Sequence, residues 1–219
     1  MPAVVDRIRK VRWERPTFDA RFYTRHEDFW PIARAAAIFA DHADWPDVEE
    51  YNRLFSSPAP VRFEEASLKR KRPPGPIDRG ELYDARITQD RVVPTRPRMW
   101  HDFLNALVWA TFPRAKMALH RRQHAAIERW IPAGATQLPN ARTREQDALA
   151  LVDEGGVLLA GDRTMFFGHA LFEGHVFGQL AMISRGVRLS GTVETADEEL
   201  AAMLDDLTRF QSPHEMPRR

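Results

Sequence analysis

Apolar residues recur at helical spacing from Met99 to Trp130, the longest stretch of the chain with this pattern. Its first half is apolar around most of a helical circumference, which predicts a buried helix. The residues that carry this pattern are Trp100, Phe103, Leu104, Leu107, Val108 and Ala110. Pro113 divides the stretch, and proline suits the first turn of a helix. We therefore expect a core helix followed directly by a second helix.

Shorter periodic segments predict further helices. Residues 31–42 and 48–55 show helical spacing behind Pro31 and Asp47, which are suited to helix starts. Thr143 and Gln146 match a capping box, so a helix is expected from there to about Val152. An amphipathic helix is expected over 196–210. A helix over 163–178 is also expected, although three glycines interrupt it.

Strands are expected where short apolar or alternating runs lie between turn residues. The candidates are 61–63, 82–88 and 157–160, with 183–189 as a further one. The segment 82–88 favours a half-buried strand because its side chains alternate between two faces. Leu82, Asp84 and Arg86 lie on one face, and Tyr83, Ala85 and Ile87 lie on the other. Together these elements predict a mostly helical α+β domain with a small mixed or antiparallel sheet.

The ends of the chain differ from its centre. Residues 1–25 are mixed and charged and predict an N-terminal arm, which Phe18, Phe22 and Tyr23 would anchor to the body. Residues 26–210 carry the periodic elements and predict one domain. Residues 211–219 predict a polar tail. The length of 219 residues, with 43% hydrophobic content, is enough to bury a sizeable core.

Charge and cysteine content narrow the classes of protein. Lys and Arg number 32 against 31 Asp and Glu, so the net charge of +1 gives no overall attraction to nucleic acid or to an anionic membrane. The chain has no cysteine, which excludes disulfides, thiolate ligands and a cysteine nucleophile. No apolar run is long enough for a signal peptide or a membrane span. We expect a cytoplasmic protein that contacts no membrane.

A run of four basic residues, Lys69–Arg72, precedes a proline-rich loop. Such a run is typical either of a nucleic-acid contact or of a solvated loop. No aromatic residues are interleaved with it, as stacking on single strands would require. We favour the solvated loop, so nucleic acid is not the expected partner.

The predicted core helix also carries polar residues. His101 and Asn105 are four apart and share a face, and Asp102 lies about 100° around the helix. A buried polar group without a partner costs about 1–3 kcal/mol, so each of the three needs one. They form either a satisfied core network or the wall of a pocket, and the sequence leaves both open.

A basic stripe follows on the second helix. Lys116, His120 and His124 recur four residues apart, with Arg121 and Arg122 beside them. The pattern favours an exposed basic face. Two histidines at this spacing can hold a metal, but no glutamate follows His120 as in a metalloprotease. If the stripe is functional, an anion is the better ligand, and Arg114, Lys116, His120 and His124 would bind it.

Two further groups complete the candidate chemistry. Asp153 and Glu154 lie at a helix C-terminus, where the dipole disfavours acids, and His169 and Glu173 are four apart. We hypothesise one cleft for acid/base or metal-assisted hydrolysis of a small molecule, with a divalent metal as candidate cofactor held by His101 and His169. The catalytic candidates are His101, Asp102, Asp153, Glu154, His169 and Glu173. Esterase-elbow, dinucleotide and P-loop motifs do not occur.

Three long motifs carry a family resemblance. The stretches WHDFLNALVWATFPRAK, RTREQDALALVDEGG and FGHALFE resemble an uncharacterised bacterial family, a domain of unknown function, over roughly residues 20–190. The resemblance implies that the three motifs belong to one domain, and it supplies no catalytic residues. Members often have lysine where this chain has Gly174. The alternative to an enzyme is a non-enzymatic binding protein that contacts anionic ligands or nucleic acid through its basic segments. The oligomeric state is left open.

Overall fold

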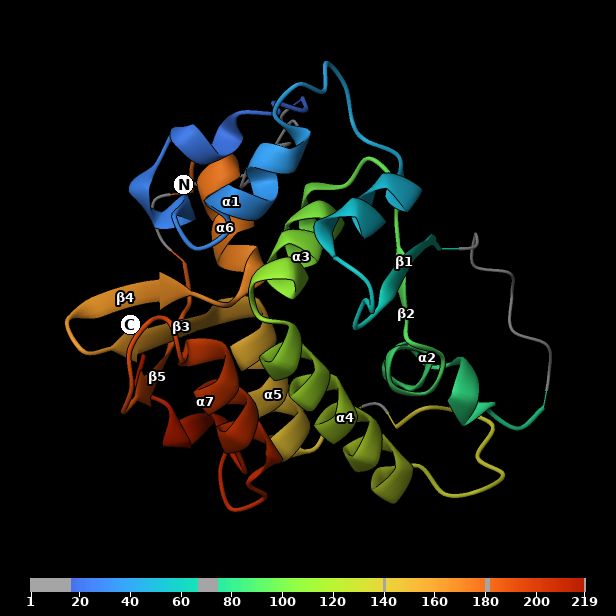
Figure 1. Cartoon of the computed structure of the whole chain (residues 1–219). Helices are drawn as coiled ribbons and strands as arrows, with labels where there is room; N and C mark the ends of the chain where they lie inside the picture. The colour runs from blue at the N-terminus through green and yellow to red at the C-terminus, as the bar shows by residue number, and fades with distance from the viewer. Residues whose placement is uncertain (1–16, 67–74, 140, 180–181, 219) are drawn as a thin grey trace, which may run out of the picture.

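Two consecutive helices form the centre of the molecule (Figure 1). The computed structural model describes residues 17–66, 75–139, 141–179 and 182–218. Helix α3 spans Trp100–Thr111 and helix α4 spans Pro113–Trp130, with Pro113 in the first turn as expected. Most of α3 is buried. None of the described helices is long and apolar enough to cross a membrane.

Helix α4 packs against three other helices. These are α2 (Tyr83–Asp90), α5 (Arg144–Gly155) and α7 (Ala196–Asp205). The capping box of α5 is present, since the Thr143 hydroxyl accepts a hydrogen bond from the Gln146 amide and the Gln146 side chain accepts one in return. Helix α7 ends five residues earlier than the predicted helix 196–210. Asp197 of α7 accepts hydrogen bonds from the first free amides of α4.

Aromatic residues from the N-terminal region pack onto α3. Phe18 stacks on Trp100, and the buried Phe22 meets the same ring edge-on. The elements here are short and mainly 3-10 helical, because each spans only a turn or two between prolines and bends. They are η1 (Phe22–Thr24), η2 (Glu27–Phe29), α1 (Ala33–Ala36), η3 (Ala37–Phe39) and η4 (Val48–Leu54). The longer helix predicted over 31–42 is therefore broken into pieces.

The strand predicted at 82–88 is wrong, because this segment is helix α2. Asp84 and Thr88, one turn apart, both face α4, where tertiary hydrogen bonds favour the helix over the strand-like alternation of the sequence. The short helix η5 (Arg79–Glu81) precedes it. Helix α2 connects β1 (Arg62–Glu65) to its parallel partner β2 (Val92–Thr95).

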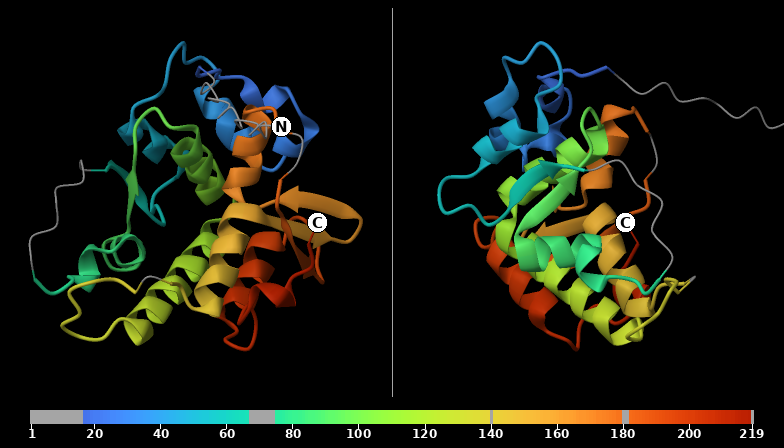
Figure 2. Two further views of the ribbon diagram at one scale, coloured as in Figure 1. Left: turned by 180° about the vertical axis from the view of Figure 1, so that it is seen from behind. Right: turned by 90° about the vertical axis from the view of Figure 1, so that its right-hand side faces the viewer.

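A second sheet has the strand order β4-β3-β5 (Figure 2). Strand β3 (Gly156–Ala160) pairs antiparallel with β4 (Arg163–Phe166) and parallel with β5 (Arg185–Leu189). The helix predicted over 163–178 is thus a strand followed by α6 (His169–Val176), and the Gly168 region separates them. The α+β class is confirmed, although the strands form two small sheets rather than one.

The C-terminal residues pack back onto the domain. After η6 (Pro213–Glu215), Met216 is buried, and the Gly186 amide of β5 donates a hydrogen bond to the Pro217 carbonyl. The segment predicted as a polar tail therefore also contributes an apolar contact.

Helices α5 and α6 approach each other closely at Gly168. A Cβ atom at this position would lie 2.4 Å from the carbonyl oxygen of Glu154. Because no side chain fits in that space, glycine allows the end of α5 to meet the start of α6. This contact brings Glu154 and His169 into one region.

Candidate functional site

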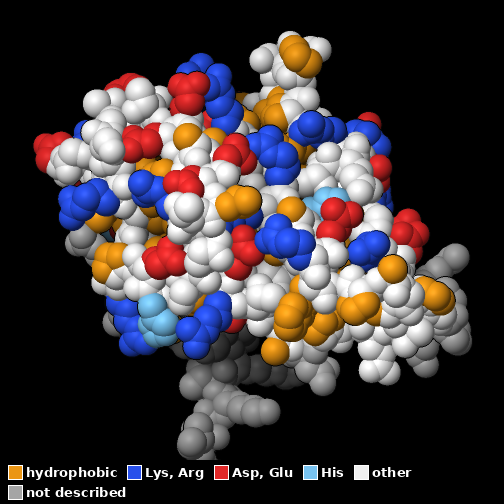
Figure 3. Space-filling view, turned by 90° about the horizontal axis from the view of Figure 1, so that it is seen from below, with side chains coloured by type: hydrophobic (Ala, Val, Ile, Leu, Met, Phe, Trp, Pro, Cys, Tyr) orange, Lys and Arg blue, Asp and Glu red, His pale blue; other side chains and the backbone are white. Residues whose placement is uncertain are grey.

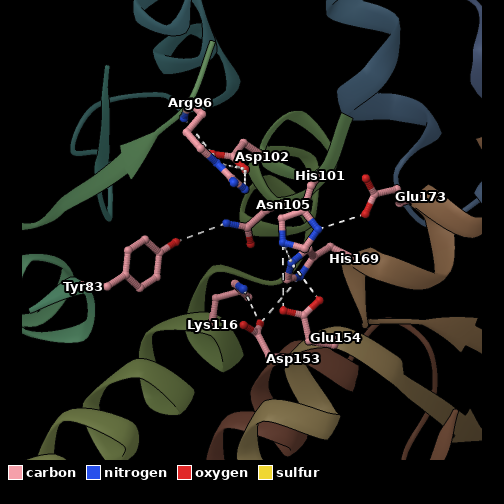
Figure 4. Close-up of polar contacts among 10 residues, drawn as sticks. All are labelled: Tyr83, Arg96, His101, Asp102, Asn105, Lys116, Asp153, Glu154, His169 and Glu173. Carbon is pink, nitrogen blue, oxygen red and sulfur yellow. Dashed lines mark hydrogen bonds and ion pairs between the residues drawn. The ribbon is translucent and has the colours of Figure 1, made fainter. Parts of the chain in front are cut away.

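The candidate site is a cavity of about 380 Å³ where α3, α5 and α6 meet the β2 segment. Figure 4 shows that side chains from these elements point toward one another. The structure thus brings parts of all three sequence motifs together. The cavity is lined by Ala66, Tyr83, Pro94, Arg96, His101, Asp102, Asn105, Asp153, Glu154 and His169.

Two histidines face each other at the centre of the site. The Nε2 atom of His101 lies 2.9 Å from the Nε2 atom of His169, with the rings at 74° to one another. The Glu154 carboxylate completes the group: one oxygen lies 3.9 Å from His101 Nε2, and the other lies 3.4 Å from His169 Nε2. One ligand atom from each residue therefore lies within 4.8 Å of the other two.

The opposite nitrogen of each histidine faces a carboxylate. Glu173 lies 3.0 Å from His101 Nδ1, and an Asp153 oxygen lies 3.9 Å from His169 Nδ1. An anionic Glu173 accepts the proton of Nδ1, which leaves the lone pair on Nε2 of His101 directed at the common centre.

The environment separates the pKa values of the three central groups. Burial lowers the pKa of His169 to about 3, so its imidazole is neutral at pH 7. The hydrogen bond that His101 donates to the Glu173 carboxylate raises the pKa of His101. Burial, followed by the nearby charge of Asp153, raises the pKa of Glu154. A neutral imidazole beside a carboxylate suits coordination of a cation.

A buried ion pair lies directly behind the histidines. The Lys116 ammonium group is 2.5 Å from Asp153, and its side chain is fully inaccessible to solvent. Burial alone would raise the pKa of Asp153, but the charge and hydrogen bond of Lys116 together with the nearby histidines His169 and His120 outweigh it and hold that pKa below its usual value. The carboxylate near His169 therefore stays ionised.

The prediction that Lys116, His120 and His124 form an exposed face is wrong, because all three are buried. His120 Nδ1 lies 2.8 Å from Asp84, and His124 Nδ1 lies 2.8 Å from the Thr88 hydroxyl. Their partners are on α2 and α5, which pack along this side of α4. The polar stripe is thus an internal contact between helices.

The arginines beside the stripe also have partners within the protein. Arg114 pairs with Glu198, and Arg121 pairs with Asp205 on the surface of α7. Arg122 is buried, pairs with Glu145 at 2.8 Å and donates to backbone carbonyls in the last turn of α7 and just after it. None of these arginines lines the central cavity.

Asp102 and Asn105 differ in how many hydrogen bonds their side chains make. Asp102 accepts hydrogen bonds from the Arg96 backbone and guanidinium group. Asn105 donates to the Tyr83 hydroxyl over 3.4 Å, whereas its buried oxygen has no hydrogen-bond partner among the described residues. Neither Arg96 nor Tyr83 was a candidate from the sequence, because each lies outside the periodic polar pattern that marked the others.

A second histidine cluster lies outside this cavity, where η2 meets α6. Asp28 lies 3.0 Å from His175 Nε2 and 3.5 Å from His26 Nδ1. The two rings are stacked, with centroids 4.2 Å apart and planes at 22°. One ligand atom from each of the three residues lies within 4.8 Å of the other two. His26 Nδ1 also accepts the Asp28 amide hydrogen bond.

The fold and the cavity define an α+β protein in which a buried histidine, a partly exposed histidine and an exposed glutamate side chain meet. Residues 74–165 match the model of a family described as "Protein of unknown function (DUF3025)". This match confirms the resemblance to an uncharacterised family, and it includes the first two motifs but not His169 or Glu173. No curated protein and no solved structure is significantly similar to the chain.

Proposed function

We propose that the protein is a divalent-metal-dependent hydrolase that acts on a small molecule. His101 and His169 hold the ion through Nε2, and Glu154 holds it through its carboxylate. Three protein ligands leave a coordination position for water or substrate, as in catalytic zinc sites with two histidines and a glutamate.

The observation that carries the proposal is the spacing of the three ligand groups. Tetrahedral coordination with bonds of about 2.1 Å requires ligand atoms about 3.4 Å apart. The two Nε2 atoms are 2.9 Å apart, and each lies 3.4 or 3.9 Å from a different oxygen of the Glu154 carboxylate, so the separations bracket that value.

The surroundings of the cluster support the same conclusion. Glu173 is hydrogen-bonded to His101 Nδ1, and an outer carboxylate of this kind orients a metal-binding imidazole. Asp153 lies 3.9 Å from His169 Nδ1 and contributes negative charge there without a hydrogen bond. The four carboxylates around the cavity exceed the two cations, Arg96 and Lys116, by two. An excess of carboxylates over cationic side chains favours a divalent cation.

A bound ion would polarise the reacting bond and lower the pKa of its water to about 7. The protein's own groups then position the reactants. Glu173 fixes the imidazole of His101, and Arg96 and Asn105 on the cavity wall contact the substrate. The water oxygen bonds to the electrophilic carbon or phosphorus, the bond to the leaving group breaks, and the water proton ends on the leaving group.

The test first measures the binding of zinc and manganese to chelator-treated protein. Calorimetry gives the affinity, and elemental analysis gives the number of ions per chain. We expect about one ion per chain, and at least a 100-fold loss of affinity in His101→Ala, His169→Ala and Glu154→Gln. His214→Ala is the matched control, because His214 is exposed and lies outside the cavity.

Hydrolysis is then measured with p-nitrophenyl acetate, p-nitrophenyl phosphate and a panel of N-acyl amino acids. Turnover that requires the metal and is lost in the three variants supports the proposal. A folded protein that binds no metal would contradict the proposed metal site. Metal binding at these residues without hydrolysis across the panel favours the alternative of a binding protein.

A further inference from the structure

An apolar pocket adjoins the candidate metal site across one residue, Tyr83. The pocket has a volume of about 310 Å³ and lies between α2, the end of α4 and the loop after α4. Its lining includes Leu82, Tyr83, Ile127, Trp130, Ile131 and Leu138. Tyr83 also lines the metal-site cavity, so the two cavities share a wall.

Tyr83 presents a different surface to each cavity. Its hydroxyl lies 3.4 Å from the Asn105 amide nitrogen, on the polar side. Tyr83 also lines the apolar pocket, beside Leu82 of the same segment, and its ring packs edge-on against that of His120. Tyrosine is suited to such a boundary, since one end is apolar and the other polar.

Large apolar side chains are exposed at this pocket. Trp130 is 49% exposed, Leu138 is 47% exposed and Tyr83 is 41% exposed. Figure 3 shows hydrophobic side chains gathered right of centre, on the side toward which α4 ends in Figure 1. Exposed apolar surface that lines a concavity marks a binding site more often than scattered single residues do.

We infer that the pocket holds the apolar part of the hydrolysed molecule, while its reactive group lies at the metal. The substrate class is an ester or amide with an aliphatic or aromatic acyl group of medium size. The inference rests on the proposed function, because it takes the metal-site cavity as the place of reaction. The volume of the pocket lies at the lower end of the range for small-ligand sites.

The experiment uses alkanoyl hydroxamates of two, six and eight carbons, whose head group chelates metals. Calorimetry measures their affinity for the zinc-loaded protein, so hydrolysis is not needed. Each methylene that enters an apolar pocket should raise the affinity by about fourfold at most. We expect the eight-carbon compound to bind at least 10-fold more tightly than the two-carbon compound.

Variants test whether the dependence of affinity on chain length arises in this pocket. Trp130→Ser and Leu138→Ser should remove most of the chain-length dependence and leave the two-carbon affinity unchanged. Tyr83→Phe should keep the dependence, because it retains the ring. Ile183→Ser and Leu207→Ser are matched controls, since both residues are highly exposed and line neither cavity.

The possible outcomes separate this inference from the proposed function. Equal affinity for all three chain lengths overturns the apolar subsite while the metal site stands. A chain-length dependence that persists in Trp130→Ser and Leu138→Ser places the alkyl group elsewhere and also overturns it. Protein that takes up no zinc overturns the proposed function and this inference with it.

Discussion

The Lys116 ammonium group lies 2.5 Å from the Asp153 carboxylate, and the lysine side chain is wholly enclosed between helices α4 and α5. Removing one member of such a pair leaves an uncompensated buried charge, which costs about 3–5 kcal/mol. We therefore expect Lys116→Met to lower the free energy of unfolding by about that amount. Asp153→Asn should do the same, and urea denaturation measures both.

The double variant and a surface pair provide the comparison. Lys116→Met combined with Asp153→Asn should recover part of the loss, because no lone charge remains. Arg121→Met breaks the Arg121–Asp205 pair, whose members are both more than half exposed, and should cost less than about 1 kcal/mol. Equal costs for Lys116→Met and Arg121→Met would contradict the buried pairing.

Glu173 should affect metal binding without contacting the metal. Its carboxylate accepts from His101 Nδ1, and loss of such an outer partner typically weakens metal binding by about 10–100-fold. We expect this loss of zinc affinity in Glu173→Gln, with little change in the thermal stability of the metal-free protein. Glu215→Gln, at an exposed position, is the control. Unchanged affinity in Glu173→Gln would show that Glu173 does not orient His101.

Asn105 distinguishes a structural network from a binding site. Its buried oxygen has no hydrogen-bond partner among the described residues, and its amide makes only one long bond. Replacement by the similarly sized leucine removes an unsatisfied polar group, so Asn105→Leu should stabilise the fold by about 1 kcal/mol. Thermal and urea unfolding measure this change. A loss of 2 kcal/mol or more would instead identify Asn105 as part of a satisfied core network.

His175 should make stability depend on pH. Burial, followed by the neighbouring His26, lowers its folded-state pKa from the usual 6.5, while Asp28 opposes the shift. Because the unfolded chain binds the proton more readily, stability is complete above pH 6.5 and is lost as pH falls toward the folded-state pKa. Between pH 7.5 and 5, the wild type should therefore lose more thermal stability than His175→Phe, which keeps the ring. Parallel curves for the two proteins would refute this linkage.

Part of the fold could be predicted from the sequence because local patterns determine it. The periodicity of 99–130, interrupted at Pro113, gives two helices in succession, and the capping box at Thr143 gives the start of α5. The apolar run at 157–160 gives β3. The candidates His101, Asp153, Glu154, His169 and Glu173 do lie together. They were chosen as polar groups inside apolar segments, which is where a packed domain places a buried site.

The remaining features depend on contacts between distant segments. Lys116, His120 and His124 have the pattern of a solvated face, and only their partners Asp153, Asp84 and Thr88 make them internal. The contacts that Asp84 and Thr88 make with α4 also favour a helix over 83–90. Arg96 and Tyr83 reach the cavity through the paths of β2 and α2, which no local pattern of residues specifies.

The close contact at Gly168 determines how much change the site can tolerate. A single methyl group at this position would clash with the end of α5, which carries Glu154. It would push that end away from the start of α6, which carries His169. Gly161 and Gly178, by contrast, have open space where a Cβ would lie. Position 168 must therefore lack a side chain for Glu154 and His169 to stay together, although glycine itself offers no reactive group.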